Sequence, residues 1–236
     1  IFRGKSRIKR KRGVKSMINI AIDGPSGAGK STVAKALAKK LGYIYVDTGA
    51  LYRAIGLYVR RAGVLPEDSA GVIALLPEID VRLAYENGEQ KVLLAGEDVG
   101  PLIRTNEISA YASKVSAIPE VRTFLLELQR DMARKNNVIM DGRDIGTVIL
   151  PDADVKIFMT ASPEARIRRR YEELLASGQS VTLEEVAAAV HERDKNDSTR
   201  KVAPAIPAAD AVFVDNSGTF ENTLSNVISI IEEKIK

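Results

Sequence analysis

The feature that most constrains the fold is a glycine-rich segment near the start of the chain, Gly24–Ser31, which reads GPSGAGKS. It matches the phosphate-binding pattern G-x-x-x-x-G-K-[ST] in full. This pattern requires a strand before it and a helix after it. A β-rich apolar run at 18–22 precedes it, apolar residues recur at four-residue spacing from Val33 to Leu41, and Gly42 is placed to end the helix. The segment therefore predicts the first strand–loop–helix unit of an α/β fold.

The same loop predicts a ligand. Glycines allow backbone N–H groups to turn inward around phosphate oxygens, and the helix N-terminus adds a partial positive charge. Lys30 would reach the β- and γ-phosphates of a nucleoside triphosphate, and the Ser31 hydroxyl would bind Mg²⁺. The chain has no N-K-x-D motif for reading guanine. The residues expected to hold the triphosphate are Gly24, Pro25, Ser26, Gly27, Ala28, Gly29, Lys30, Ser31 and Thr32.

Strand and helix patterns alternate from Met17 onward. Helix starts carry caps, such as Ser162 before Pro163 and the capping box of Thr182 with Glu185. This alternation favours a parallel sheet covered by helices on both faces. Strands are expected at 18–22, 43–46, 138–140, 155–159 and 211–214. Helices are expected at about 33–41, 51–63, 106–117 and 119–134, from 162, from 182 and at 220–231.

Residues 79–98 break this alternation. Apolar side chains occupy every second position from Ile79 to Tyr85, and Asn87-Gly88 is a strong turn signal. Residues 92–94 would form the return strand. The segment predicts an antiparallel hairpin inserted into the α/β fold.

Charge is distributed unevenly along the chain. The net charge is +4, but residues 1–16 contain eight bases and no acid, which leaves 27 bases against 31 acids in residues 17–236. We interpret the basic segment as an N-terminal extension or disordered arm ahead of Met17. Nonspecific binding of this arm to nucleic acid or to anionic lipid is the alternative.

Composition excludes several kinds of site. The chain has no cysteine and a single histidine, His191, so disulfides, thiolate metal sites and multi-histidine zinc sites are excluded. No apolar run approaches the ~20 residues needed to span a bilayer. We expect a cytoplasmic protein without a membrane partner.

Arginines and carboxylates occur beside predicted strand ends and helix termini. Arg53 follows the turn at 47–49, and Arg143 and Asp144 follow the strand at 138–140, where open α/β sheets bind ligands. An arginine fork binds phosphate bidentately and stays charged, so the set indicates a second anionic ligand near the first. Its other members are Arg104, Arg193, Asp197 and Arg200.

The alternative for each arginine is a solvated charge on a helix face. We favour that alternative for Arg166, Arg168, Arg169 and Arg170, each taken singly. For Arg143 with Asp144, in a glycine-flanked loop after an apolar strand, we favour a binding role.

Longer motifs occur in a fixed order: IDGPSGAGKST (22–32), DTGALYRA (47–54), GEDV…IRT (96–105), DGRDIGTVILPDADVKIFM (141–159), ERDKNDSTR (192–200) and APAIPAADAV (203–212). The last four are not shared by P-loop enzymes in general. On these motifs, residues 17–236 resemble the bacterial cytidylate kinases, which belong to the nucleoside monophosphate kinase group.

The resemblance implies a P-loop fold of three parts. These are a core with a five-stranded parallel sheet, a monophosphate-binding region at about 47–118 with the β insertion at about 79–98, and a short lid at about 166–200. It also implies transfer of the γ-phosphoryl group of ATP, with Mg²⁺, to CMP or dCMP in pyrimidine metabolism, by a monomer. Residues 1–16 lie outside the resemblance.

Carried over by motif, the resemblance implies that cytosine is read by Ser113, Arg122 and Asp144. A carboxylate accepts a hydrogen bond from the exocyclic amine of cytosine, where uracil presents an oxygen that the carboxylate repels. From the residues alone, Ser113 would be a solvent-facing helix serine. The other acceptor residues are Arg53, Arg143 and Arg200 at the phosphate, Arg193 and Asp197 on the sugar or lid side, and Thr48 in the pocket wall. The residues expected to act in transfer are Lys30, Arg143, Arg193 and Arg200.

No protein base is required, because the acceptor phosphate oxygen is already anionic near neutral pH. Asp141 would either hold Mg²⁺ through water or brace its loop, and both alternatives stay open. Among the lid arginines, Arg169 is expected to lie nearest to the phosphates. The rival functions are a kinase of UMP or AMP, a nucleotide-dependent nucleic-acid-binding protein that uses the basic arm, and a P-loop switch protein.

Overall fold

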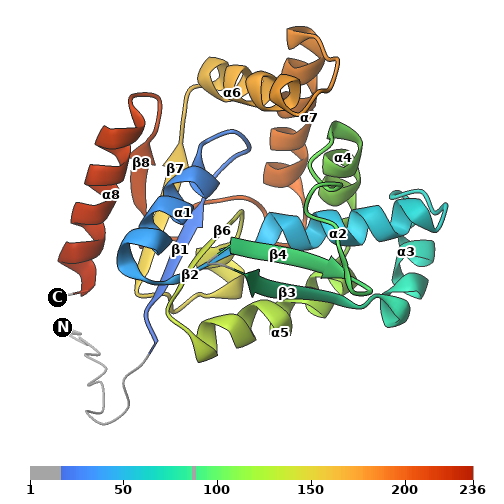
Figure 1. Cartoon of the computed structure of the whole chain (residues 1–236), viewed down its shortest axis with the longest axis horizontal. Helices are drawn as coiled ribbons and strands as arrows, with labels where there is room; N and C mark the ends of the chain where they lie inside the picture. Colours follow the sequence, from blue (N-terminus) through green and yellow to red (C-terminus); the bar gives the residue numbers. More distant parts are fainter. Residues whose placement is uncertain (1–16, 87–88, 236) are drawn as a thin grey trace, which may run out of the picture.

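A parallel sheet forms the centre of the computed structural model, which describes residues 17–86 and 89–235. Its five strands lie in the order β2–β6–β1–β7–β8 (Figure 1). They are β1 (Asn19–Asp23), β2 (Ile44–Asp47), β6 (Val138–Gly142), β7 (Val155–Thr160) and β8 (Val212–Asp215). The predicted strands are confirmed with small shifts at their ends. The predictions for residues 1–16 and for the Asn87-Gly88 turn lie outside the described residues.

Helices cover both faces of this sheet. α1 (Lys30–Leu41) and α8 (Phe220–Ile235) pack on one face, and α5 (Pro119–Lys135) packs on the other. Successive side chains of a strand point to opposite faces. In β1, Ile20 and Ile22 accordingly join the core under α1 and α8, and Ala21 joins the core under α5. The three-layer α/β fold predicted from the sequence is confirmed.

A second, antiparallel sheet lies beside the first. β3 (Val81–Glu86) pairs with β4 (Glu89–Leu94), and β4 pairs with the short β5 (Glu97–Asp98). The hairpin prediction is confirmed. Three helices complete this part: α2 (Thr48–Arg61), α3 (Ser69–Leu75) and α4 (Asn106–Val115). They share one apolar core with β3 and β4. The sequence did not predict α3, although Asp68 caps it by accepting a hydrogen bond from the Gly71 N–H.

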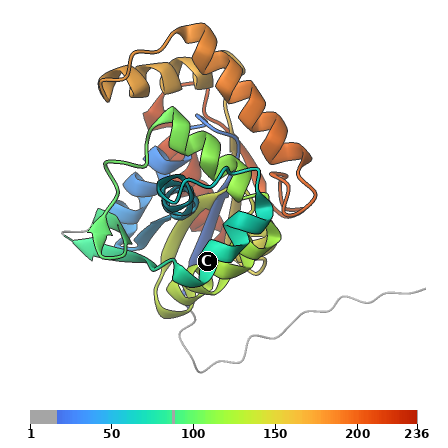
Figure 2. The same cartoon turned by 90° about the vertical axis from the view of Figure 1, so that its right-hand side faces the viewer.

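Two helices, α6 (Pro163–Ala176) and α7 (Leu183–Thr199), project from the rest of the chain (orange in Figure 2). Their predicted caps are confirmed, because Ser162 caps α6 and Thr182 with Glu185 forms a capping box on α7. Leu174, Val186 and Val190 form a small apolar cluster between the two helices. This cluster is separate from the main cores, so the pair has little apolar contact with the sheet.

The carboxyl ends of the central strands meet at one edge of the sheet. Asp23 of β1 lies beside Gly142 of β6, and Asp47 of β2 lies beside Asp141 of β6. β1 leads into the glycine-rich loop, and β6 leads into a π-helical turn at Ile145–Ile149. Loops from three strands therefore converge where open α/β sheets bind ligands. Among the described helices, none is long and apolar enough to cross a membrane.

Candidate active site

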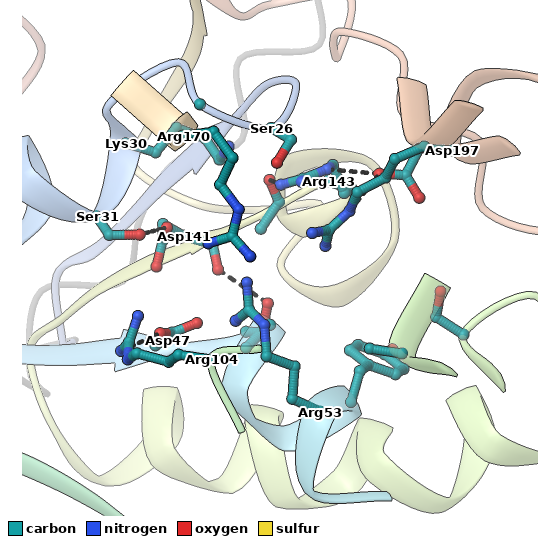
Figure 3. A pocket seen from close by; sticks show the side chains of 18 of the residues that line it. Ser26, Lys30, Ser31, Asp47, Arg53, Arg104, Asp141, Arg143, Arg170 and Asp197 are labelled. Carbon is teal, nitrogen blue, oxygen red and sulfur yellow. Dashed lines mark hydrogen bonds and ion pairs between the residues drawn. The ribbon is translucent and has the colours of Figure 1, made fainter. Parts of the chain in front are cut away.

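A cavity of about 570 Å³ lies at the carboxyl ends of these strands. Its wall combines the glycine-rich loop, the first turns of α2 and α5, the C-terminal end of α4, the segment after β6, and parts of α6 and α7. In Figure 3 the side chains of Arg53 and Arg170 reach into it from opposite sides. The cavity therefore joins the glycine-rich loop to most of the arginines that the sequence singled out.

The glycine-rich loop is fixed by contacts that only glycine permits. Gly24 has a φ of 145°, and a Cβ there would lie 1.9 Å from the carbonyl oxygen of Met159. A Cβ at Gly29, whose φ is 85°, would lie 2.3 Å from the Asn216 side chain. That side chain donates from Nδ2 to the carbonyl oxygen of Ala28 over 2.8 Å. The loop is thus held against β7 and the segment after β8, with the N-terminus of α1 at its end.

Lys30 is buried at the start of α1, and its Nζ donates to the Pro25 carbonyl oxygen over 2.7 Å. Burial holds the pKa of Lys30 well below its usual value, and the positive charge of Arg143 lowers it further. Both effects oppose a buried ammonium group that lacks a full counter-charge. A bound polyphosphate would supply that charge.

Asp141 is a buried carboxylate that accepts two hydrogen bonds. Ser31 Oγ donates to Oδ2 over 2.8 Å, and Tyr45 Oη donates to Oδ1 over 2.9 Å. Burial and the nearby charge of Asp47 raise the pKa of Asp141 to about 6. A hydroxyl beside a carboxylate suits Mg²⁺, which takes few protein ligands and completes its shell with phosphate and water. Within the part of the chain that the structure describes, no cluster of three or more metal-ligating residues was found.

Arginines outnumber carboxylates on the opposite wall. Arg143 Nε donates to Asp197 Oδ2 over 2.9 Å, Arg193 Nε lies 3.7 Å from the same oxygen, and Arg200 Nη1 lies 3.9 Å from Asp197 Oδ1. Burial lowers the pKa of Arg193 to about 9, assisted by the charge of Arg143, and burial also lowers the pKa of Arg53. The cluster therefore carries unneutralised positive charge and favours an anion.

A second charged group lies between α5 and the segment after β6. Arg122 and Asp144 form a buried ion pair, and Arg200 Nη2 lies 3.6 Å from Asp144 Oδ1. Arg122 also donates from Nη1 to the Ser116 carbonyl oxygen over 3.0 Å, and its guanidinium lies 5.4 Å from the centre of the Tyr52 ring. These contacts hold a carboxylate between two arginines in the cavity wall, an arrangement able to recognise an amine with adjacent acceptors.

Ser113 does not line the main cavity. It is buried on α4, and its Oγ has no hydrogen-bond partner. It lines a second cavity of about 160 Å³, whereas the Arg122–Asp144 pair lines the first. Ser26, Arg170 and Arg193 line both cavities. The expectation of a solvent-facing serine is wrong, because Ser113 is buried and lines a cavity to which residues of α7 also contribute. Its contact with cytosine stays a prediction.

The interpretation of the α6 arginines as solvated charges holds for Arg168, which is exposed, and is wrong for Arg166. Arg166 is buried; its Nη1 donates to the Ser26 carbonyl oxygen over 3.0 Å and pairs with Asp194 of α7. A Cβ at Gly27 would lie 2.8 Å from the Arg166 carbonyl oxygen. Arg166 therefore ties the glycine-rich loop to both projecting helices.

Arg169 and Arg170 are half-buried, and both line the main cavity. Arg169 donates to the Asn216 carbonyl oxygen over 2.7 Å. Arg170 donates to Asn106 Oδ1 of α4 over 3.2 Å, and its side chain extends into the cavity (Figure 3). That Arg169 lies nearest to bound phosphates stays a prediction.

Sequence reasoning missed several residues at or beside the site, among them Tyr52, Ser116 and Asn216. Tyr52 had a signal, since it follows Thr48 at i+4 and so shares its face of α2. Ser116 acts through its carbonyl oxygen and Asn216 through a contact with Ala28, 188 residues away along the chain. Neither contact leaves a local sequence pattern.

The fold and site together define the class of protein. A strand–P-loop–helix unit, a hydroxyl and carboxylate beside it, and an arginine cluster across one cavity are the parts of a P-loop kinase. A solved structure of an uncharacterised protein from Eubacterium ventriosum aligns with a TM-score of 0.51 at 14% identity, covering 92% of this chain and 99% of that chain. At that identity the likeness supports the α/β fold alone.

Comparisons with known sequences identify one family within this class. A family model described as cytidylate kinase matches residues 20–236. The chain is 50% identical over 218 residues to the cytidylate kinase of Carboxydothermus hydrogenoformans, covering 92% of this chain and 98% of the relative. It is 51% identical over 216 residues to that of Geobacter sulfurreducens, covering 91% and 93%. The chain belongs to the cytidylate kinase family.

Proposed function

We propose that the main cavity is a two-substrate transfer site, in which the P-loop holds ATP and the arginine-rich wall holds CMP or dCMP. As a member of its family, the chain is an ATP-dependent transferase that phosphorylates CMP or dCMP. The products are ADP and CDP or dCDP. One observation carries the assignment of the site: a buried carboxylate flanked by arginines, Asp144, lines the same cavity as the P-loop.

The donor half is formed by Gly24–Thr32. Its backbone N–H groups and the N-terminus of α1 would surround the phosphates of ATP. Lys30 would exchange the Pro25 carbonyl for β- and γ-phosphate oxygens. Ser31 directly, and Asp141 through water, would hold Mg²⁺, which offsets the negative charge of the phosphates during transfer.

The acceptor half would bind the monophosphate through Arg53, Arg143 and Arg200. Excess positive charge in this cluster supports the assignment, because a phosphate dianion would restore the balance. Phosphoryl transfer depends on alignment and on charge stabilisation. Lys30, Arg143, Arg193 and Arg200 would stabilise the transferring group. The anionic acceptor oxygen attacks without a protein base.

Cytosine would be read by the buried group around Asp144. Its carboxylate would accept from the exocyclic amine of cytosine, and it would repel the oxygen that uracil carries at that position. Arg122, held against Tyr52, would donate to the acceptor atoms of the ring. Ser113, whose hydroxyl is unpaired, would also contact the base. Arg193 and Asp197 would lie on the sugar or lid side.

We propose the same division of the chain that the resemblance implies. The monophosphate-binding region is about 47–118, with its β insertion at about 79–98, and the lid is about 166–200. The contact of Arg170 with Asn106 supports a lid that closes on this region. We further propose a monomer located in the cytoplasm, which suits a chain without cysteine.

The test is ADP release from ATP and Mg²⁺, measured across CMP, dCMP, UMP, AMP and GMP. We expect strong stimulation by CMP and dCMP and weak stimulation by UMP. No stimulation by CMP would overturn the proposal. Equal stimulation by CMP and UMP would contradict the reading of cytosine by Asp144.

A further inference from the structure

Side chains of the inserted hairpin contact the outer edge of the central sheet at β2. β2 lies at one end of the sheet, with β6 as its neighbour on one side. Ile44 donates its N–H toward the β6 side, to the Asn137 carbonyl oxygen. Because backbone groups alternate along a strand, the C=O of Tyr45 and the N–H of Asp47 point the other way, where none of the described strands follows.

Two side chains of the inserted hairpin form hydrogen bonds with these outward backbone groups of β2. Tyr85 Oη donates to the Tyr45 carbonyl oxygen over 3.0 Å, and Gln90 Oε1 accepts from the Asp47 N–H over 2.9 Å. Tyr85 and Gln90 are directly opposite each other in the β3–β4 pair. A single cross-strand pair thus contacts two successive outward positions of β2 and takes the place of a neighbouring strand.

Asp47, which Gln90 contacts, directly precedes α2, and α2 forms part of the cavity wall. Asp47 Oδ1 accepts from the Ala50 N–H over 3.0 Å and so caps α2. α2 brings Thr48, Tyr52 and Arg53 to the cavity. Arg104, which follows the insertion, places Nη2 3.4 Å from Asp47 Oδ2. The insertion therefore contacts the backbone of Asp47, and Arg104, which follows it, contacts the Asp47 side chain.

We infer that the Tyr85–Gln90 pair is a positioning element for the acceptor side of the site. It fixes the end of β2, and through it the start of α2, so that Arg53 and its neighbours meet the monophosphate in a set geometry. Neither side chain lines the cavity, so neither is a catalytic residue. The P-loop follows β1, and within the described residues no hydrogen bond joins it to Tyr85 or Gln90, so we expect the larger effect on the acceptor substrate. The inference rests on the proposed function.

The experiment compares Tyr85→Phe, Gln90→Met and the double variant with the wild-type chain, by steady-state ADP release and by thermal unfolding. Each single change removes one hydrogen bond, whose typical worth corresponds to an about five-fold change in binding. We expect the KM for CMP to rise about five-fold in each single variant and further in the double variant. The KM for ATP should stay within about two-fold.

Lys91→Met is the matched control. Lys91 pairs with Glu86 and lies 3.9 Å from Asp98, and both partners belong to the inserted sheet, not to β2. It should lower thermal stability without changing the KM for CMP. Equal changes in both KM values, or an equal effect of Lys91→Met, would overturn the inference. An active wild type with unchanged variants overturns the inference alone, whereas a wild type without CMP-dependent ADP release overturns the proposed function as well.

Discussion

Asp144→Asn is the change that separates recognition of the base from binding of ATP. Asp144 is 3% exposed, pairs with Arg122 and lies 3.6 Å from Arg200. The amide keeps the volume and removes the charge. A hydrogen bond to a charged group contributes about 1.5–3 kcal/mol, and two arginines lose part of their counter-charge. A loss of about 2–4 kcal/mol in the transition state for CMP corresponds to an about 30- to 1,000-fold lower kcat/KM.

The assay is ADP release with CMP and with UMP, beside the dissociation constant for ATP in the absence of acceptor. ATP affinity should change less than about three-fold, since Asp144 lies outside the P-loop. The ratio of kcat/KM for CMP to that for UMP should fall, because an amide can donate to the uracil oxygen. Asp68→Asn, at the cap of α3, is the control for loss of a carboxylate outside the cavity. Equal losses for CMP and ATP, or an unchanged CMP-to-UMP ratio, would refute the reasoning.

Two further predictions concern the donor side and stability. Ser31→Ala removes a proposed Mg²⁺ ligand and should lower kcat about 10- to 100-fold while leaving the CMP dissociation constant unchanged; weaker CMP binding in calorimetry would contradict this. The second prediction concerns Asp23, which accepts from the N–H groups of Ile145 and Gly146 and whose pKa burial raises to about 6. The folded chain therefore keeps this proton to higher pH than the unfolded chain, so the contribution of Asp23 to the free energy of unfolding falls between about pH 4 and pH 6, by about 3 kcal/mol in total. Denaturant unfolding of the wild type and Asp23→Asn across this range should show the difference, and parallel pH profiles would disprove it.

Local signals in the sequence predicted most of the fold. The P-loop pattern specifies a strand, a loop and a helix within about 20 residues, and capping boxes mark helix starts through contacts three residues apart. The inserted hairpin was predicted for the same reason, because alternation and a turn signal are both local. α3 was missed: it is only one short helix, Ser69–Leu75, with one buried residue, Val72, so its periodicity is weak.

Less of the candidate site than of the fold could be predicted from the sequence. The motifs pointed to Arg143 and Asp144, but the loop that holds them depends on Asp23, 122 residues earlier in the chain. The sequence analysis interpreted Arg166 as a surface charge, because no neighbouring residue in the sequence indicates its contact with Ser26, 140 residues away. Burial of a polar side chain is set by which elements pack over it. Residue type and spacing do not carry that information.

The most direct test of the central claim follows the phosphoryl group itself. The chain is incubated with ATP labelled at the γ-phosphate, Mg²⁺ and CMP, and the labelled products are separated. The account predicts that the label passes to the terminal phosphate of CDP, with one ADP formed for each CDP, and that little label moves without CMP. Release of the label as inorganic phosphate at the same rate with and without CMP would contradict it.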